Sequence, residues 1–215
     1  TSAQTETSSG FTTQALPPLK AYQLSGDTFL GPKETLLCRS QQLNIDLYPQ
    51  ISVLLGDVEM GCGPEQALES IRFLMLSQQV VFDQLKQQEI LQASGFMQSR
   101  GPTSFSPVAI SLDELNDYWK KGKAYFQVQM QRNGKRVSQL DTGADMLFHF
   151  GEIISFIAST RSISAGTVLS CGPISQLPES LKKQSDLSAC FSAVADKRSI
   201  EQFQESNSIS EFYQF

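Results

Sequence analysis

The chain has 215 residues, of which 40% are hydrophobic, with a mean hydropathy of −0.19 and a net charge of −5. This composition predicts a single folded domain with a sizeable core. No basic cluster and no run of 18 apolar residues occurs, so neither a nucleic-acid partner nor a membrane partner is expected. Without a recognisable signal peptide or a CxxC pair among its four cysteines, we expect a cytoplasmic protein with free thiols.

The first half of the chain predicts an arm, a strand and a helix. Residues 1–17 are rich in Thr, Ser and Gln and predict a flexible arm before a folded domain over residues 18–215. The apolar run ISVLLG at 51–56 predicts a buried strand. Pro64 suits the first turn of a helix, and apolar side chains then recur at helical spacing as far as Met75, which predicts one helix between them.

The middle of the chain contains a capping pattern and a hairpin pattern. Ser111 is followed three residues later by Glu114, a capping box that predicts a short helix. Apolar and polar side chains alternate over residues 124–140, around the pair Asn133-Gly134. Alternation on both sides of an Asn-Gly pair predicts a β-hairpin with a type I′ turn.

The remaining segments predict an α+β fold with several non-adjacent strands. Residues 94–110 predict a loop that ends in a strand. An apolar stripe over 150–161 predicts a helix, and AGTVLSCG at 165–172 predicts a buried strand after a glycine turn. Residues 195–206 predict a weaker amphipathic helix.

The segment LNIDLYPQIS at 43–52 is the most informative strand. Because side chains alternate along a strand, Asp46, Tyr48 and Gln50 project to one face. A row of polar groups on a buried strand is a common way to build a carboxylate metal site, yet only Asp46 is a carboxylate. Pro49 cannot donate to a sheet ladder, which predicts an edge or a bulge.

The chain resembles the bacterial branch of the fumarylacetoacetate hydrolase (FAH) superfamily over residues 18–215. The segments that carry the resemblance follow the family's order: GDTFLGPKE, GDVEMGCGPEQALESIRFLMLS, GFMQSRGPTSFSPVAISLDEL, DTGADMLFHFGEIISFIASTRSISAGTVLSCG and AVADKRSIE. The resemblance implies a mixed β-roll or β-sandwich core of the FAH C-terminal-domain type with a few flanking helices, often as a homodimer. It also implies a divalent metal, usually magnesium, held by carboxylates to polarise keto-acid oxygens.

The metal carboxylates of the family have no carboxylate counterparts in this sequence. The family strand Asp-x-Glu-x-Glu aligns with Asp46, Tyr48 and Gln50, and the third carboxylate position falls at Gln78 and Gln79. A phenol and two amides bring no charge to a metal shell. We therefore expect no cofactor, and Mg²⁺ or Ca²⁺ only if the family site is retained in some other form.

Other family positions are also changed. Arg100 stands where the family has a lysine, and Pro173 stands where it has the threonine of a carboxylate-binding loop. We expect Asp46, Tyr48, Gln50, Gln79, Arg100 and Pro173 to line a ligand pocket. Candidates for catalysis are Arg100, His149 and Cys171. His149 fits a helix cap or a core position better, and Cys171 a packed thiol. Asp145 is interpreted as a turn residue.

These changes predict a pseudoenzyme, meaning an FAH-like domain that serves as a scaffold, a subunit or a ligand-binding protein. The resemblance also predicts a homodimer. The alternative is a diverged hydrolase, hydratase or decarboxylase that acts on acylpyruvate-like or 2-keto acid substrates without a metal, using Tyr48, Arg100 and either His149 or Cys171. A small keto-acid-like ligand suits either interpretation. The family's general-base histidine lies on a segment upstream of this sequence, so we expect a chain shortened at both ends.

Overall fold

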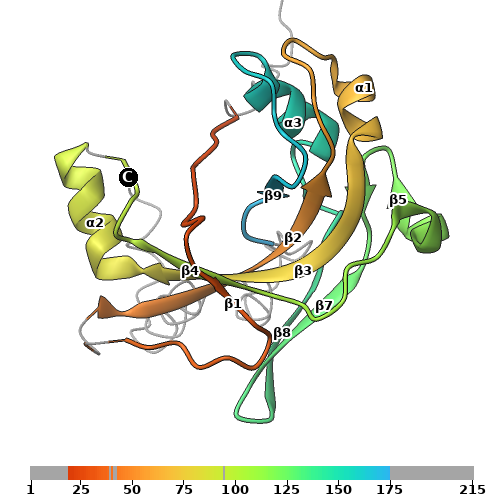
Figure 1. Cartoon of the computed structure of the whole chain (residues 1–215). Helices are drawn as coiled ribbons and strands as arrows, with labels where there is room; N and C mark the ends of the chain where they lie inside the picture. The colour runs from red at the N-terminus through yellow and green to blue at the C-terminus, as the bar shows by residue number, and fades with distance from the viewer. Residues whose placement is uncertain (1–18, 39, 41–42, 94, 175–215) are drawn as a thin grey trace, which may run out of the picture.

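The computed structural model describes residues 19–38, 40, 43–93 and 95–174 (Figure 1). The strands are β1 (Phe29–Leu30), β2 (Ile45–Leu55), β3 (Ile71–Phe82), β4 (Arg100–Phe105), β5 (Trp119–Lys120), β6 (Lys123–Ala124), β7 (Gln127–Arg132), β8 (Lys135–Asp141) and β9 (Val168–Ser170). The helices are α1 (Pro64–Glu69), α2 (Asp83–Gln92), the 3-10 helix η2 (Leu112–Tyr118) and α3 (Phe150–Ala158). A five-stranded sheet has the order β1-β4-β3-β2-β9, and β5–β6 and β7–β8 form separate pairs.

This arrangement is the expected α+β class, whereas closure into a β-roll stays a prediction. The predicted arm at 1–17 and the predicted helix at 195–206 lie outside the described residues. Within the described ranges, no helix has the length and apolar character that crossing a membrane requires.

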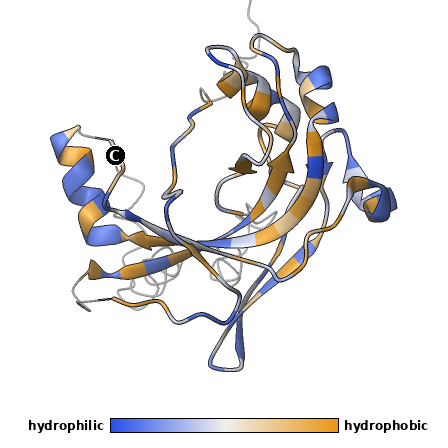
Figure 2. Ribbon diagram, viewed as in Figure 1, coloured by the Kyte–Doolittle hydropathy of each residue, from blue (hydrophilic) through white to orange (hydrophobic). Residues whose placement is uncertain are grey.

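The sheet is centred on the antiparallel pair β2–β3, which runs from Ile45 opposite Phe82 to Leu55 opposite Ile71. At one end of these long strands lie α1 and α3, and at the other end lies α2 (Figure 1). Apolar side chains of β2, α1 and α3 share one buried core, which includes Ile51, Val53, Leu55, Ala67, Phe150, Ile154 and Ala158. The orange segments of β2, β3 and α3 in Figure 2 mark this apolar layer. Each large side chain buried there contributes about 1.5–3 kcal/mol.

The predicted helix from Pro64 to Met75 is wrong in its second half. Helix α1 ends at Glu69, and the chain continues as β3. The backbone N–H of Gly56 donates to the carbonyl oxygen of Ser70 (2.7 Å), which ties the helix end to the end of β2. The apolar run that follows pairs residue by residue with β2, and this tertiary pairing overrides the helical spacing.

The predicted hairpin and the predicted helix at 150–161 are confirmed as β7–β8 and α3. Asn133 and Gly134 both have positive φ, 51° and 73°, as a type I′ turn requires. The short helix after Ser111 is present as η2, but it is a 3-10 helix interrupted at Asn116, and Ser111 makes no side-chain cap. Strand β9 confirms the strand predicted within 165–172.

Helix α2 and strand β4 were not predicted in their places. The only buried residue of α2 is Glu89, so the helix has no apolar stripe for sequence reasoning to detect. Strand β4 occupies the middle of the expected loop at 94–110, and at the expected strand end there is a single bridge between Ile110 and Leu74.

Pro49 lies in a central strand rather than at a sheet edge. Its carbonyl oxygen accepts a hydrogen bond from the backbone N–H of Ile174 (3.0 Å), on the side of β2 that faces β9. In a strand, the N and C=O of one residue point to the same side, so the missing N–H of Pro49 does not interrupt the β2–β3 ladder. Strand β9 pairs only with Ser52, Val53 and Leu54, beyond the proline.

Close approach of α3 to α1 gives a testable prediction. A Cβ atom at Gly151 would overlap the carbonyl oxygen of Pro64, whereas nothing lies within 4 Å of a Cβ at Gly26. We expect Gly151→Ala to lower the free energy of unfolding by about 1–3 kcal/mol, as overpacking does. Gly26→Ala should stay within about 0.5 kcal/mol of wild type. Urea unfolding measures both, and equal stabilities would contradict the packing described.

Candidate functional site

A cleft of about 1410 Å³ lies over one face of the sheet. Side chains of β2, β3 and β4 line it, together with residues 19–26 and residues 170–174 at the end of β9 and beyond. In Figure 1 the first described segment, drawn in red, runs between α2 and α3. Segments far apart in the sequence therefore meet at this cleft.

A polar row crosses the sheet beneath the cleft. Tyr48 of β2 is opposite Gln79 of β3, and Gln79 is opposite Thr103 of β4. Residues directly opposite each other on antiparallel strands point to the same face. Gln50, Gln79 and Thr103 are at most 2% exposed. These three residues and Tyr48 line the cleft. The row predicted on β2 is thus extended by Gln79 and Thr103.

Gln79 is the centre of a hydrogen-bond network. Its Oε1 accepts from Nε2 of Gln50 (3.0 Å) and from Nη1 of Arg100 (3.4 Å). A guanidinium can only donate, so the atom of Gln79 that faces Arg100 must be the oxygen. The same reasoning makes the nitrogen of Gln50 the atom that meets this oxygen. Arg100 therefore sets the orientation of both amides.

Arg100 lies beside two aromatic rings, Tyr22 and Phe96, which pack edge to face against each other. Its Cζ is 5.3 Å from the ring centroid of Tyr22 and 5.1 Å from that of Phe96, within the range of cation–π attraction. Burial holds the pKa of Arg100 below its ordinary value, and the nearby Tyr48, Tyr22 and Glu89 offset only part of this effect. Among the described residues no carboxylate lies within 4.0 Å of the guanidinium. Arg100 is thus a partly buried cation without an ion-pair partner in this part of the chain.

A second cation lies beside Tyr48. Nζ of Lys86, on α2, donates to the phenol oxygen of Tyr48 (3.3 Å) and is 5.8 Å from its ring centroid. Sequence reasoning missed Lys86 because α2 carries no helical stripe. It also missed Thr103, because only the register between β3 and β4 brings this residue beside Gln79.

The loop before Arg100 is held by a carboxylate. Glu89 accepts hydrogen bonds from the backbone N–H groups of Met97 (2.9 Å), Gln98 (2.6 Å) and Ser99 (3.3 Å), and from the Ser99 hydroxyl. Desolvation raises the pKa of Glu89, but these hydrogen bonds outweigh it and hold the pKa below its ordinary value of 4.5. Glu89 therefore fixes the segment that orients Arg100.

The remaining predicted residues occupy different places. Pro173 and Cys171 line the cleft, and burial raises the pKa of the Cys171 thiol to about 11, so the thiol stays protonated at neutral pH. Asp46 is 1% exposed, and its Oδ1 accepts from the backbone N–H of Leu47 (2.9 Å). Asp46 is not among the cleft-lining residues, whereas Asp145 lines the cleft from a turn.

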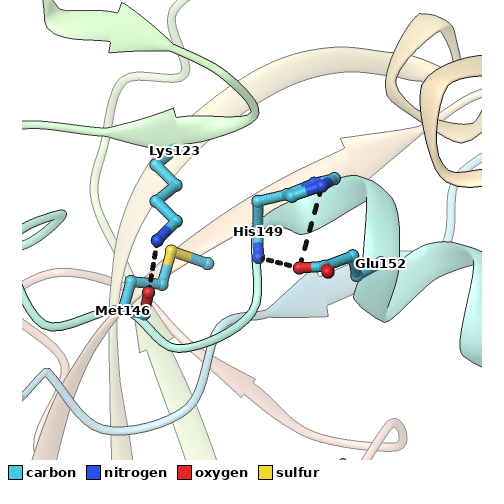
Figure 3. Close-up of polar contacts among 4 residues, drawn as sticks. All are labelled: Lys123, Met146, His149 and Glu152. Carbon is cyan, nitrogen blue, oxygen red and sulfur yellow. Dashed lines mark hydrogen bonds and ion pairs between the residues drawn. The ribbon is translucent and has the colours of Figure 1, made fainter.

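His149 is the N-cap residue of α3 and does not line the cleft. The backbone N–H of His149 donates to Oε2 of Glu152 (2.8 Å), and Nε2 of His149 lies 3.7 Å from the same oxygen (Figure 3). Lys123 donates to the carbonyl oxygen of Met146 in the same region (Figure 3). These contacts tie the start of α3 to its surroundings, as the cap interpretation expects.

The polar row does not fit a divalent metal. Magnesium prefers charged oxygen ligands, and Tyr48, Gln50 and Gln79 offer a phenol and two neutral amides. Oε1 of Gln79 already accepts two hydrogen bonds, one of them from the Arg100 cation, which would repel a metal ion. Among the described residues no group of three or more His, Cys, Asp and Glu side chains could hold a metal.

Residues 3–200 match the model of the family described as fumarylacetoacetate (FAA) hydrolase C-terminal. Among solved structures, the chain is similar to a fumarylacetoacetate hydrolase family protein from Yersinia pestis CO92, with 15% identity and a TM-score of 0.51 over 67% of this chain and 65% of that one. It is also similar to yeast ynq8, a protein of the same family, with 16% identity and a TM-score of 0.52 over 60% and 54%.

A third similar structure is fumarylpyruvate hydrolase from Pseudomonas aeruginosa in complex with Mn²⁺ and pyruvate. It shares 13% identity and a TM-score of 0.50, over 69% of this chain and 62% of that one. At these identities the likeness shows the fold alone. The chain spans between 44% and 65% of the length of the first three similar structures. No curated protein matches the chain in sequence.

The low pKa of Glu89 predicts a pH-dependent effect of Glu89→Gln. A carboxyl with a depressed folded-state pKa stabilises the fold fully above its ordinary value of 4.5 and loses this effect as the pH falls below it. Glu89→Gln should therefore be less stable than wild type at neutral pH, and the difference should shrink below pH 4.5. Urea unfolding across this range measures it, with Gln88→Ala, an exposed neighbour, as control. A pH-independent difference would contradict the assignment.

Proposed function

Because the chain belongs to the fumarylacetoacetate hydrolase family, we propose that it is a member without the family's metal-dependent chemistry and acts as a non-catalytic, ligand-binding domain. The observation that carries the proposal is the hydrogen bond from Arg100 to Gln79. The family resemblance assigns the position of Gln79 to a metal carboxylate. A guanidinium directed at that position and a divalent cation bound there exclude each other.

The surroundings of this bond support the same proposal. The phenol oxygen of Tyr48 accepts from Lys86, so a second of the three family metal positions is also in contact with a cation. Gln50 donates to Gln79, which leaves the two amides bonded to each other. The two contacts with cations favour a neutral or anionic ligand over a metal ion.

The cleft itself supports ligand binding. It lies over the buried polar side chains of Gln50, Gln79 and Thr103, and Tyr22 and Arg100 also line it. His149 does not line the cleft, and Cys171 lines it but stays protonated at neutral pH, so neither residue serves as a base there. The expected homodimer, the expected keto-acid-like ligand and the alternative of a diverged metal-free hydrolase stay predictions.

Restoring the carboxylates tests the proposal. We expect wild type not to bind Mn²⁺ in isothermal titration calorimetry, whereas the triple variant Tyr48→Glu, Gln50→Glu, Gln79→Asp should gain a site, because it returns three charged oxygen ligands to one face of β2 and β3. A matched control is Gln127→Glu, Gln129→Glu, Gln139→Asp on the β7–β8 hairpin, which adds the same charge on exposed positions.

Two outcomes would contradict the proposed function. One is Mn²⁺ binding by wild type that is lost in the variant Gln79→Leu. The other is hydrolysis of an acylpyruvate by wild type in the presence of EDTA.

A further inference from the structure

Three buried hydrogen-bond donors at the cleft have no partner among the described residues. They are Nε2 of Gln79, Oγ1 of Thr103 and Nε of Arg100. Folded proteins pair the great majority of such buried groups, and exceptions often mark the place of a ligand. The side chains of Gln79 and Thr103 are each 1% exposed, so bulk water does not satisfy them.

These donors belong to one contiguous group. Gln79 and Thr103 are directly opposite each other on β3 and β4, and Arg100 bonds to Gln79. All three residues line the same cleft. Several unpartnered donors on neighbouring residues of one cleft, with a guanidinium among them, suit the oxygens of an anion.

Charge favours the same kind of ligand. Arg100 is partly buried and has no carboxylate within 4.0 Å in the described part of the chain. Lys86 adds a second cation at Tyr48, on the lining of the same cleft. A partly buried cation is stabilised by an opposite charge, which a bound anion would supply.

One unpartnered acceptor narrows the ligand class. Oε1 of Gln50 is buried and has no partner among the described residues, and its own Nε2 is fixed on Gln79. An amide oxygen accepts a hydrogen bond but cannot donate one. A hydroxyl beside the carboxylate of the ligand would satisfy this oxygen, whereas a keto oxygen at the same place would not.

We propose that Arg100, Gln79 and Thr103 form a metal-independent binding site for a small 2-hydroxy carboxylate, with the carboxylate on the three donors and the hydroxyl on Gln50. The carboxylate fits the planar guanidinium, which recognises two oxygens of such a group at once. This inference rests on the proposed function, because a metal bound at Gln79 would displace Arg100 from it.

Calorimetric titration of the full chain with lactate, in EDTA, tests the inference. We expect lactate to bind, and to bind more tightly than pyruvate, which differs from it only in the keto oxygen. Thr103→Val keeps the shape of the side chain and removes one donor, so it should weaken lactate binding by about tenfold or more. Arg100→Gln should abolish binding. Arg136→Gln removes the same charge from an exposed hairpin position and should bind lactate like wild type.

Each contrary outcome would overturn one part of the proposed binding site. Absence of lactate binding by wild type, or unchanged binding by Thr103→Val, would overturn the site. Equal affinity for pyruvate would overturn the role of Gln50, and equally tight, Arg100-dependent binding of inorganic phosphate would overturn the carboxylate class. These outcomes differ from a failure of the proposed function. That failure would be detected as Mn²⁺ binding by wild type, not as an absence of lactate binding.

Discussion

The long antiparallel pairing of β2 with β3 is the constraint on which the rest of the structure depends. It sets Tyr48 opposite Gln79 and, because side chains alternate, it sends Val53 and Leu55 to the opposite side of β2 from Gln50. A slip of one residue would exchange the two faces, bringing buried amides into the core and apolar groups to the cleft. One register therefore determines both the hydrophobic core and the polar lining of the site.

The polar face carries no negative charge at Tyr48, Gln50 and Gln79, and two cations, Lys86 and Arg100, donate hydrogen bonds to it. With glutamates at positions 48 and 50 and an aspartate at 79, Arg100 would meet a cluster of anions and compete with a metal for them. With Tyr48, Gln50 and Gln79 present, the guanidinium instead orients two amides and keeps its Nε without a partner among the described residues. In the function that we propose, this face favours an anion over a cation, while the strand pairing beneath it keeps the register described above.

Local patterns predicted the elements whose signal is local. The β7–β8 hairpin and α3 follow from alternation, an Asn-Gly turn and an apolar stripe, and the polar row of β2 follows from a period of two. The segment from Ile71 onward was misassigned because pairing with β2, a contact distant in sequence, decides its conformation. The cation–π contacts of Arg100 with Tyr22 and Phe96, and the approach of Lys86 to Tyr48, were likewise invisible, since they depend on how separate segments meet over the sheet.

The most direct test of the central claim is a crystal structure of the wild-type chain grown with Mn²⁺ and measured at the manganese absorption edge. The account predicts no anomalous peak among Tyr48, Gln50 and Gln79, and a guanidinium nitrogen of Arg100 within hydrogen-bond distance of Oε1 of Gln79. An anomalous peak at those three side chains, with Arg100 turned away from Gln79, would contradict it.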